Sequence, residues 1–295
     1  MYCDLHTHST YSDGTFSPAQ LISEAKKLGL TVALTDHNTV SGLPAFMAEA
    51  ERQGVTAVPG IELSTVYDKK ELHLLGLFIA PEYYAAVEQL AKENLRLKQI
   101  SNAALVEKLR TAGYRIDYDA IQRQNPNGNT NRAHIAAALM EMGYVESIRE
   151  AFDTLLNEGN GFYEPLRRLQ LTDGIRFLRQ IHALPILAHP LKDLSESALR
   201  ALLPEAINAG LLGIETHHSA YSREQTRLAA QIAEEFHLLP SGGSDFHGTI
   251  KPQVHLGCPP VPLEFYEKLL YHYKKSGTDA AGNDIKYIFQ KGASQ

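Results

Sequence analysis

Six histidines and three carboxylates stand at positions where the sequence pattern predicts strands to end or to pair. They are His6, His8, Asp13, His37, Glu62, His73, His189, Asp245 and His247. Imidazole and carboxylate are the side chains that bind the divalent metals of hydrolytic centres, and nine such groups are enough for two or three ions. The set therefore predicts a metal centre suited to phosphoester hydrolysis.

The spacing of these residues places most of them at one end of a predicted sheet. His6-Thr7-His8 follows the first predicted strand, and Asp245-Phe246-His247 follows the last. The other positions after strands are Asp36-His37, Glu62 and His189. Side chains two residues apart in an extended chain point to the same side. A lone histidine is more often a packing residue, but packing does not explain six of them gathered at strand ends.

The elements that position these residues are alternating strands and helices. Short apolar runs predict strands over residues 2–5, 31–35, 55–59, 64–67, 71–79, 184–188, 212–215 and 238–241. Amphipathic segments predict helices over residues 18–28, 43–52, 172–182, 195–209 and 222–236. The turn Asp68-Lys69-Lys70 predicts a hairpin whose return strand carries His73. Counting the units of strand and helix gives about seven strands, so we expect an α/β fold closed into a barrel of parallel strands with helices outside.

A long helical stretch interrupts this rhythm. From Pro81 to Gly113 the apolar residues recur with helical periodicity, without a strand signal between them. A polar loop over residues 124–129 and helices over 132–142 and 145–156 follow. We predict a barrel formed by residues 1–97 and 165–295, interrupted by a helical insert over residues 98–164.

Composition limits the classes of partner. The chain has 295 residues, of which 44% are hydrophobic and 21% charged, so it can bury a full core. Its net charge of −6 argues against a broad basic face for long nucleic acid, which leaves a small substrate or one gripped at its end. Two cysteines cannot form a disulfide scaffold, and there is no run of eighteen apolar residues. We expect a cytoplasmic protein that is not bound to a membrane; the sequence carries no signal for an oligomeric state.

The motifs around these residues resemble those of the polymerase and histidinol phosphatase (PHP) family. They are His6-Thr7-His8-Ser9, Ser12-Asp13-Gly14-Thr15, Thr35-Asp36-His37-Asn38, Pro59-Gly60-Ile61-Glu62, His73, Ala188-His189-Pro190 and Gly243-Ser244-Asp245-Phe246-His247-Gly248. The resemblance covers nearly the whole chain. It implies a distorted (β/α)7 PHP barrel and a metal-dependent phosphoesterase.

Three further segments resemble one subgroup of this family. They are Arg132-Ala133-His134-Ile135-Ala136, the segment from Gly159 to Pro165, and Gly213-Ile214-Glu215 with His218-Ser219. Members of that subgroup remove the 3′-phosphate of nucleoside 3′,5′-bisphosphates such as pAp, and some trim short RNA from its 5′ end. Two positions depart from the subgroup: Ala133 replaces its usual proline, and His217 precedes His218.

The resemblance also implies which residues bind which ion. His6, His8, Glu62 and Asp245 would bind the first, Glu62, His73 and His189 the second, and Asp13, His37 and His247 the third. Glu62 would bridge two ions, because a carboxylate can give one oxygen to each. Asp13, Glu62 and Asp245 would thereby hold the ions that activate the attacking water. Asp36 either orients a neighbouring ligand or caps the next turn.

The donor set has no thiolate and mixes nitrogen with oxygen. Such a set suits Mn²⁺, Zn²⁺ or Fe²⁺ better than Mg²⁺, and the family resemblance favours Mn²⁺. A substrate with two phosphates needs a second anion site, for which Arg132 and His134 at the start of an insert helix are candidates. The alternative for these two residues is a solvated first helical turn. His218 and Ser219 are candidates for further substrate contacts, by their match to the subgroup.

Three functions fit the sequence. The first is a phosphatase that acts on the 3′-phosphate of pAp-like nucleotides, and the second is a 5′-3′ exoribonuclease on short RNA. They differ in whether the space beyond the 3′ position is closed or open. Other phosphomonoesters, such as AMP or histidinol phosphate, stay open as substrates. The third is a noncatalytic module that binds metal or nucleotide, against which the nine intact ligand positions argue.

Overall fold

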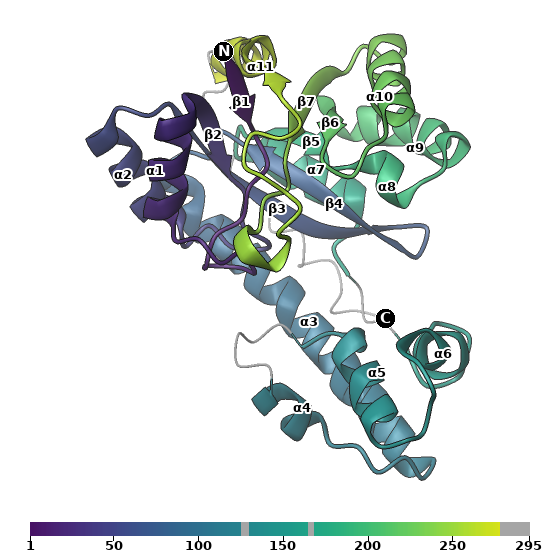
Figure 1. Ribbon diagram of the computed structural model, residues 1–295. Coiled ribbons are helices and arrows are strands. Elements are labelled where there is room, and N and C mark those ends of the chain that lie inside the picture. The colour runs from purple at the N-terminus through teal and green to yellow at the C-terminus, as the bar shows by residue number, and fades with distance from the viewer. Residues whose placement is uncertain (125–129, 165–167, 278–295) are drawn as a thin grey trace. The chain divides into compact units, whose positions relative to one another are not determined.

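The computed structural model describes residues 1–124, 130–164 and 168–277 (Figure 1). The chain forms two compact units, the first made of Met1–Gln89 and Leu169–Gln295 and the second of Leu90–Arg168. Residues 125–129, which make up most of the predicted polar loop, lie outside the described residues, as does residue 165, where the barrel was predicted to resume. The boundaries predicted for the helical insert, at residues 98 and 164, remain predictions. None of the described helices is long and apolar enough to cross a membrane.

The first unit is built on one eight-stranded sheet with the order β7-β6-β5-β4-β3-β2-β1-β8. The strands are β1 (Tyr2–Asp4), β2 (Leu30–Leu34), β3 (Ala57–Tyr67), β4 (Lys70–Leu77), β5 (Leu184–Leu187), β6 (Gly213–His218), β7 (Leu239–Gly243) and β8 (Val261–Pro262). β4 is antiparallel to both neighbours, as the hairpin predicts, and β8 is antiparallel to β1; the other pairs are parallel. The predicted α/β barrel is confirmed, and β8 adds a strand too short to be seen in the sequence pattern.

The sheet curls until its two ends nearly close. The Leu5 amide donates to the Gly242 carbonyl at 3.1 Å, and beyond β1 and β7 Thr7 pairs with Phe246 in a parallel bridge. These contacts bring the segment after the first strand against the segment after the seventh. The two His/Asp motifs predicted from the sequence therefore meet at the same end of the barrel.

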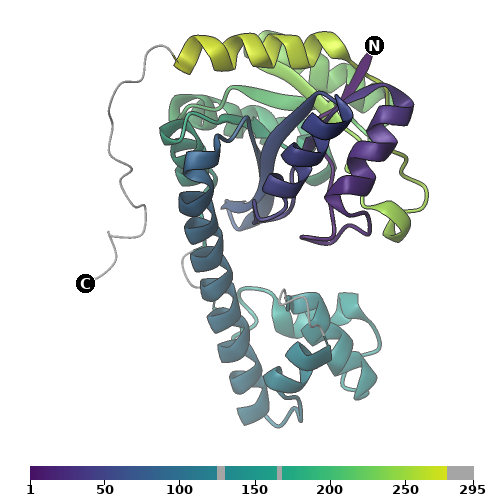
Figure 2. The same cartoon turned by 90° about the vertical axis from the view of Figure 1, so that its left-hand side faces the viewer.

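Helices cover the outside of this sheet. They are α1 (Pro18–Leu28), α2 (Leu43–Gln53), α7 (Leu171–Gln180), α8 (Pro190–Asp193), α9 (Glu196–Ala209), α10 (Arg223–Glu235) and α11 (Leu263–Gly277), with short 3-10 turns η1 (Pro81–Tyr83) and η3 (Gly248–Ile250). α1 begins at the predicted cap, since the Ser17 hydroxyl accepts from the Gln20 amide, and ends at Gly29 in the left-handed conformation. α11 lies across the strands at the top of Figure 2 and buries Leu269 in the barrel core.

One strand runs longer than the sequence predicts. We expected separate strands over residues 55–59 and 64–67, with Glu62 in the connection; this is wrong, because β3 is continuous from Ala57 to Tyr67. It continues past the edge of β2 because β4 pairs with it from Gly60 to Tyr67. Glu62 therefore projects from a strand held on both sides, in a fixed position that a loop would not provide.

The second unit is helical and has its own core. It holds most of α3 (Tyr84–Thr111), with α4 (Tyr118–Gln124), α5 (Arg132–Glu141), α6 (Ile148–Ala151) and a π-helical turn η2 (Phe152–Leu156). Its buried side chains include Leu105, Leu109, Ile135 and Leu139. The sequence predicts one helix over residues 145–156, which the structure divides into α6 and η2.

Candidate metal centre

Strand alternation brings four predicted ligands together at the barrel closure. His6 and His8 flank Thr7, while Asp245 and His247 flank Phe246, the residue with which Thr7 pairs. Residues i and i+2 of an extended segment face the same side, so both pairs turn into the barrel mouth. His6 Nε2 lies 3.7 Å and His8 Nε2 3.3 Å from Asp245 Oδ1.

Glu62 lies at the centre of the predicted ligands and is fully buried. Its Oε2 is 3.1 Å from His6 Nε2, 3.2 Å from His8 Nε2 and 3.1 Å from His37 Nδ1, while its Oε1 is 2.8 Å from His73 Nδ1 and 3.1 Å from His189 Nε2. The two oxygens thus face two different groups of imidazoles. This is the arrangement that a carboxylate bridging two cations requires.

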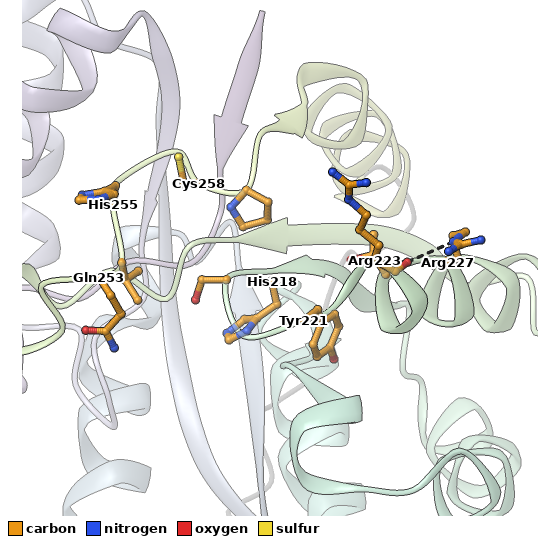
Figure 3. Close-up of a pocket in the computed structure, with 11 residues that line it drawn as sticks. His218, Tyr221, Arg223, Arg227, Gln253, His255 and Cys258 are labelled. Carbon is orange, nitrogen blue, oxygen red and sulfur yellow. Dashed lines mark hydrogen bonds between the residues drawn. The ribbon is translucent and has the colours of Figure 1, made fainter.

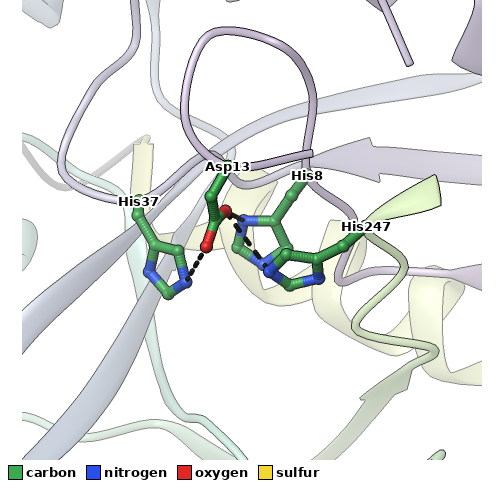
Figure 4. A group of neighbouring side chains, drawn as sticks. All are labelled: His8, Asp13, His37 and His247. Atoms are coloured by element: carbon green, nitrogen blue, oxygen red, sulfur yellow. Dashed lines mark ion pairs between the residues drawn. The ribbon is translucent and has the colours of Figure 1, made fainter. Parts of the chain in front are cut away.

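A second group gathers around Asp13, whose side chain is 56% exposed (Figure 4). Its carboxylate lies 3.3 Å from His247 Nε2 and 3.8 Å from His37 Nε2. His8 Nδ1 is 3.8 Å away, so His8 faces this group with one ring nitrogen and Glu62 with the other. The structure thus brings all nine predicted metal ligands into one cluster, and Asp13 forms its solvent-facing side.

The donor atoms of this cluster fit divalent cations. Within the described residues, buried atoms that lack a hydrogen-bond partner include His6 Nε2, both ring nitrogens of His8, Glu62 Oε2 and His73 Nδ1. Burying polar atoms without partners is costly. His6 Nε2 and His8 Nε2 face Glu62 Oε2, His73 Nδ1 faces Glu62 Oε1, and His8 Nδ1 faces Asp13. Cations held among them would supply the missing partners, and the mixture of nitrogen and oxygen donors suits Mn²⁺, Zn²⁺ or Fe²⁺.

The electrostatics of the cluster also favour cation binding. Burial raises the pKa of Glu62, but the neighbouring His37, His6 and His73 outweigh it and hold that pKa well below its usual range. Burial lowers the pKa of His37 to about 3, which leaves its ring neutral. Burial also lowers the pKa of His73, but Glu62 outweighs it and raises that pKa to about 10. Without a cation the cluster therefore holds protons, which metal binding would displace.

Glu215 holds two of the predicted ligands, a role that its position in the sequence did not predict. It lies fully buried in β6, where its Oε1 is 3.0 Å from His6 Nδ1 and its Oε2 accepts from the His189 amide at 2.7 Å. One carboxylate therefore fixes ligands predicted for two different ions. In the sequence, Glu215 is an acidic residue at the end of an apolar strand. This pattern does not distinguish a buried residue that orients metal ligands from a surface residue.

Replacing Glu215 by Gln tests this supporting role. Because the amide keeps the shape but loses the charge that holds His6, we expect the affinity for Mn²⁺ to fall about 10- to 100-fold. The affinity is measured by isothermal titration calorimetry with Mn²⁺. The matched control is Glu196→Gln, on the surface of α9. Unchanged affinity in Glu215→Gln would show that the carboxylate does not hold His6 for metal binding.

Two more buried carboxylates hold the loops that carry ligands. Asp36 accepts from the Ser9 amide at 2.7 Å, the Ser9 hydroxyl at 2.7 Å and the Ser12 hydroxyl at 2.6 Å. It therefore fixes the loop between His8 and Asp13; these contacts test neither of its two predicted roles, which were to orient His37 and to cap the next turn. Asp4 accepts from the Ser244 amide and hydroxyl in the same way, just before Asp245.

Of the predicted substrate residues, His218 lies beside the cluster. It is 2% exposed, its Nδ1 accepts from the Ala220 amide at 3.1 Å, and its Nε2 lies 3.6 Å from Asp245 Oδ2. Lys251, for which the sequence predicts no role, donates to the same oxygen at 2.9 Å. Ser219 lines a pocket together with His218.

Arg132 and His134 open helix α5 in the helical unit. His134 Nδ1 accepts from the Asn131 amide at 3.1 Å, so its ring closes the capping box of the helix. Arg132 Nη1 donates to the Leu156 carbonyl at 2.9 Å, and its guanidinium lies 4.3 Å from the centre of the Tyr163 ring. Neither side chain is a freely solvated first-turn residue.

Comparison with known proteins agrees with this site. Residues 4–162 match the PHP domain model. The 5′-3′ exoribonuclease Rnm of Salmonella typhimurium is 31% identical over 86% of this chain and 87% of its own length, and the 3′,5′-nucleoside bisphosphate phosphatase of Chromobacterium violaceum is 29% identical over 83% and 86%. A solved structure from Bifidobacterium adolescentis, described as that of a metal-dependent phosphoesterase, superimposes with a TM-score of 0.68 at 27% identity, over 91% of this chain and 95% of its own.

The domain match covers the segments that carry His6, His8, Asp13, His37, Glu62 and His73. The domain match spans more than half of the chain, and the exoribonuclease similarity extends over most of both proteins. The barrel, the ligand motifs and the buried donor atoms agree with one chemistry, metal-dependent hydrolysis of phosphoesters. The chain belongs to the PHP domain family.

Proposed function

We propose that this phosphoesterase removes the 3′-phosphate from nucleoside 3′,5′-bisphosphates such as pAp. The observation that carries the proposal is the set of buried, unpartnered nitrogen and oxygen atoms around Glu62, which suits several cations bound side by side. Such a site binds a phosphate ester through its phosphoryl oxygens. The similarity to the nucleoside bisphosphate phosphatase of Chromobacterium violaceum supports the choice of substrate.

The chain's own groups suggest how three ions would be held. The proposed sets are His6, His8, Glu62 and Asp245 for the first ion, Glu62, His73 and His189 for the second, and Asp13, His37 and His247 for the third. Mn²⁺ is the proposed metal. Bound ions would activate water and neutralise the phosphoryl charge. Asp13, Glu62 and Asp245 supply the anionic ligands, and the pKa values of all three are held below their usual range by neighbouring groups, against the opposing effect of burial.

Arg132 and His134 are the proposed binding site for the 5′-phosphate of the substrate. The ring contacts of Arg132 hold its guanidinium in place while donors other than Nη1 remain for an anion. Replacing Arg132 by Gln should lower kcat/KM for pAp about tenfold more than for adenosine 3′-monophosphate, which lacks the second phosphate. Steady-state kinetics on the two nucleotides measures this, with Arg96→Gln, on the surface of α3, as the control. An equal loss on both nucleotides would contradict the assignment.

A 5′-3′ exoribonuclease activity on short RNA is the second proposed function. It is supported by the similarity to Rnm of Salmonella typhimurium and by a pocket that adjoins His218. Both activities break the same bond, between phosphorus and O3′. One metal cluster can therefore serve both activities, which differ only in whether another nucleotide follows the phosphate.

The proposal is tested by phosphate or nucleotide release from pAp, AMP, histidinol phosphate and a short 5′-phosphorylated RNA. Each substrate is assayed with added Mn²⁺ and with a chelator. We expect metal-dependent release from pAp and from the RNA. The ratio of the two release rates shows which activity is the stronger. Release from AMP or histidinol phosphate alone would reject the proposed substrates, and no metal-dependent release would favour a noncatalytic role.

A further inference from the structure

A pocket of about 600 Å³ lies beside the metal cluster in the barrel unit (Figure 3). The turn between β6 and α10, with the first turn of α10, forms one side, and the segment after η3 forms the other. Its lining includes His218, Tyr221, Arg223, Thr226, Gln253 and His255. A volume of this size lies within the range of small-molecule sites, about 300–1,000 Å³, and is sufficient for a nucleotide.

His218 joins this pocket to the metal cluster. It lines the pocket, yet its Nε2 lies 3.6 Å from Asp245 Oδ2, and no hydrogen-bond partner for that nitrogen occurs among the described residues. Lys251 Nζ donates to the same carboxylate oxygen. A phosphate group held at the cluster would therefore have the pocket next to it, with two cationic or hydrogen-bonding groups at the boundary.

The pocket carries groups that recognise a phosphorylated nucleoside. The guanidinium of Arg223 makes no ion pair within the described part of the chain, whereas Arg227 on the next turn is paired with Glu224 at 3.3 Å. Tyr221 is held by its hydroxyl, which accepts from the Leu191 amide at 2.9 Å, so its ring has a fixed orientation. An unpaired guanidinium binds phosphate, and a fixed aromatic ring stacks a base.

We propose that this pocket binds the nucleotide that follows the scissile phosphate in an RNA substrate. The inference rests on the proposed function, hydrolysis of the bond between phosphorus and O3′ at the metal cluster. In the diester reaction the water oxygen joins the phosphorus, the bond from phosphorus to O3′ breaks and O3′ takes a proton. The phosphate stays on the downstream nucleotide, which Tyr221 and Arg223 hold. A nucleoside bisphosphate has no downstream nucleotide and leaves the pocket empty. Occupancy of the pocket therefore distinguishes an RNA substrate from pAp.

The kinetic test compares the 5′-phosphorylated trinucleotide pApApA with pAp. Arg223→Gln should lower the ratio of kcat/KM for pApApA to kcat/KM for pAp about tenfold, because only the trinucleotide places a phosphate beside Arg223. The matched control is Arg200→Gln, since Arg200 pairs with Glu196 and Glu235 away from the pocket. It should keep the wild-type ratio. A ratio in Arg223→Gln equal to that of the wild type would overturn the proposal.

A binding measurement separates this inference from the proposed function. The 5′-hydroxyl trinucleotide ApApA, labelled at its 3′ end, is titrated with the full-length protein in chelator and followed by fluorescence anisotropy. We expect Arg223→Gln to weaken this binding about tenfold and Arg200→Gln to leave it at the wild-type value. If neither pApApA nor pAp is hydrolysed but Arg223→Gln still weakens binding of ApApA, the proposed function is wrong and the assignment of the pocket to RNA is supported. Equal affinities of wild type and Arg223→Gln for ApApA would reject the assignment of the pocket to RNA, whichever substrates the enzyme hydrolyses.

Discussion

Replacing Glu62 by Gln should lower phosphoester hydrolysis about a thousandfold, the largest effect that we expect of any single substitution in this protein. The two oxygens of Glu62, which is fully buried, face separate groups of imidazoles, three near Oε2 and two near Oε1. An amide of the same shape offers one neutral oxygen and one NH₂ group. It therefore cannot bridge two cations or balance their charge.

Two measurements check the Glu62 prediction. Phosphate release from pAp reports the rate, and elemental analysis of the purified protein reports the metal content, which should fall with it. Glu235→Gln, on the surface of α10, is the matched control and should resemble the wild type in both. Hydrolysis by Glu62→Gln within tenfold of the wild type would contradict the bridging role.

Replacing Asp4 by Ala should have the largest effect on stability, lowering the free energy of unfolding by about 3–5 kcal/mol. Asp4 is fully buried and accepts from the Ser244 amide at 2.9 Å, the Ser244 hydroxyl at 2.6 Å and the Gly257 amide at 2.8 Å. Alanine would leave these donors buried without partners. The same contacts fix the segment just before Asp245, so the change also disturbs the metal cluster.

Urea denaturation of the metal-free protein measures the Asp4 effect without a contribution from bound metal. Asp4→Asn keeps the shape and one acceptor oxygen, and should lose about half as much stability as Asp4→Ala. Glu24→Ala, on the exposed face of α1, should change the stability by no more than about 0.5 kcal/mol. A loss below about 1 kcal/mol in Asp4→Ala would show that other groups satisfy these donors.

The four ligand positions at the barrel closure were readable from the sequence because they follow predicted strands. His6 and His8, like Asp245 and His247, are separated by one residue, and the period of a strand alone places each pair on one face. The caps of α1 were equally local, since Ser17, Pro18 and Gly29 mark the two ends of the helix. These are signals that neighbouring residues carry without reference to the rest of the fold.

The features that the sequence did not show depend on contacts between distant segments. β3 passes through Glu62 without a break only because β4 returns beside it. Glu215 contacts His6 and His189 only because β6 lies beside β5, the strand that precedes His189. The pocket requires the residues after η3 to lie over the turn before α10. No local period or motif encodes such arrangements.

Anomalous diffraction from crystals soaked in Mn²⁺ tests whether the cluster around Glu62 holds several divalent cations. We predict at least two anomalous peaks inside the cluster, on either side of the Glu62 carboxylate and about 3.5–4 Å apart. A third peak beside Asp13, His37 and His247 would complete the proposed set. Crystals that bind Mn²⁺ only outside the nine residues, or nowhere, would show that the cluster is not a metal centre.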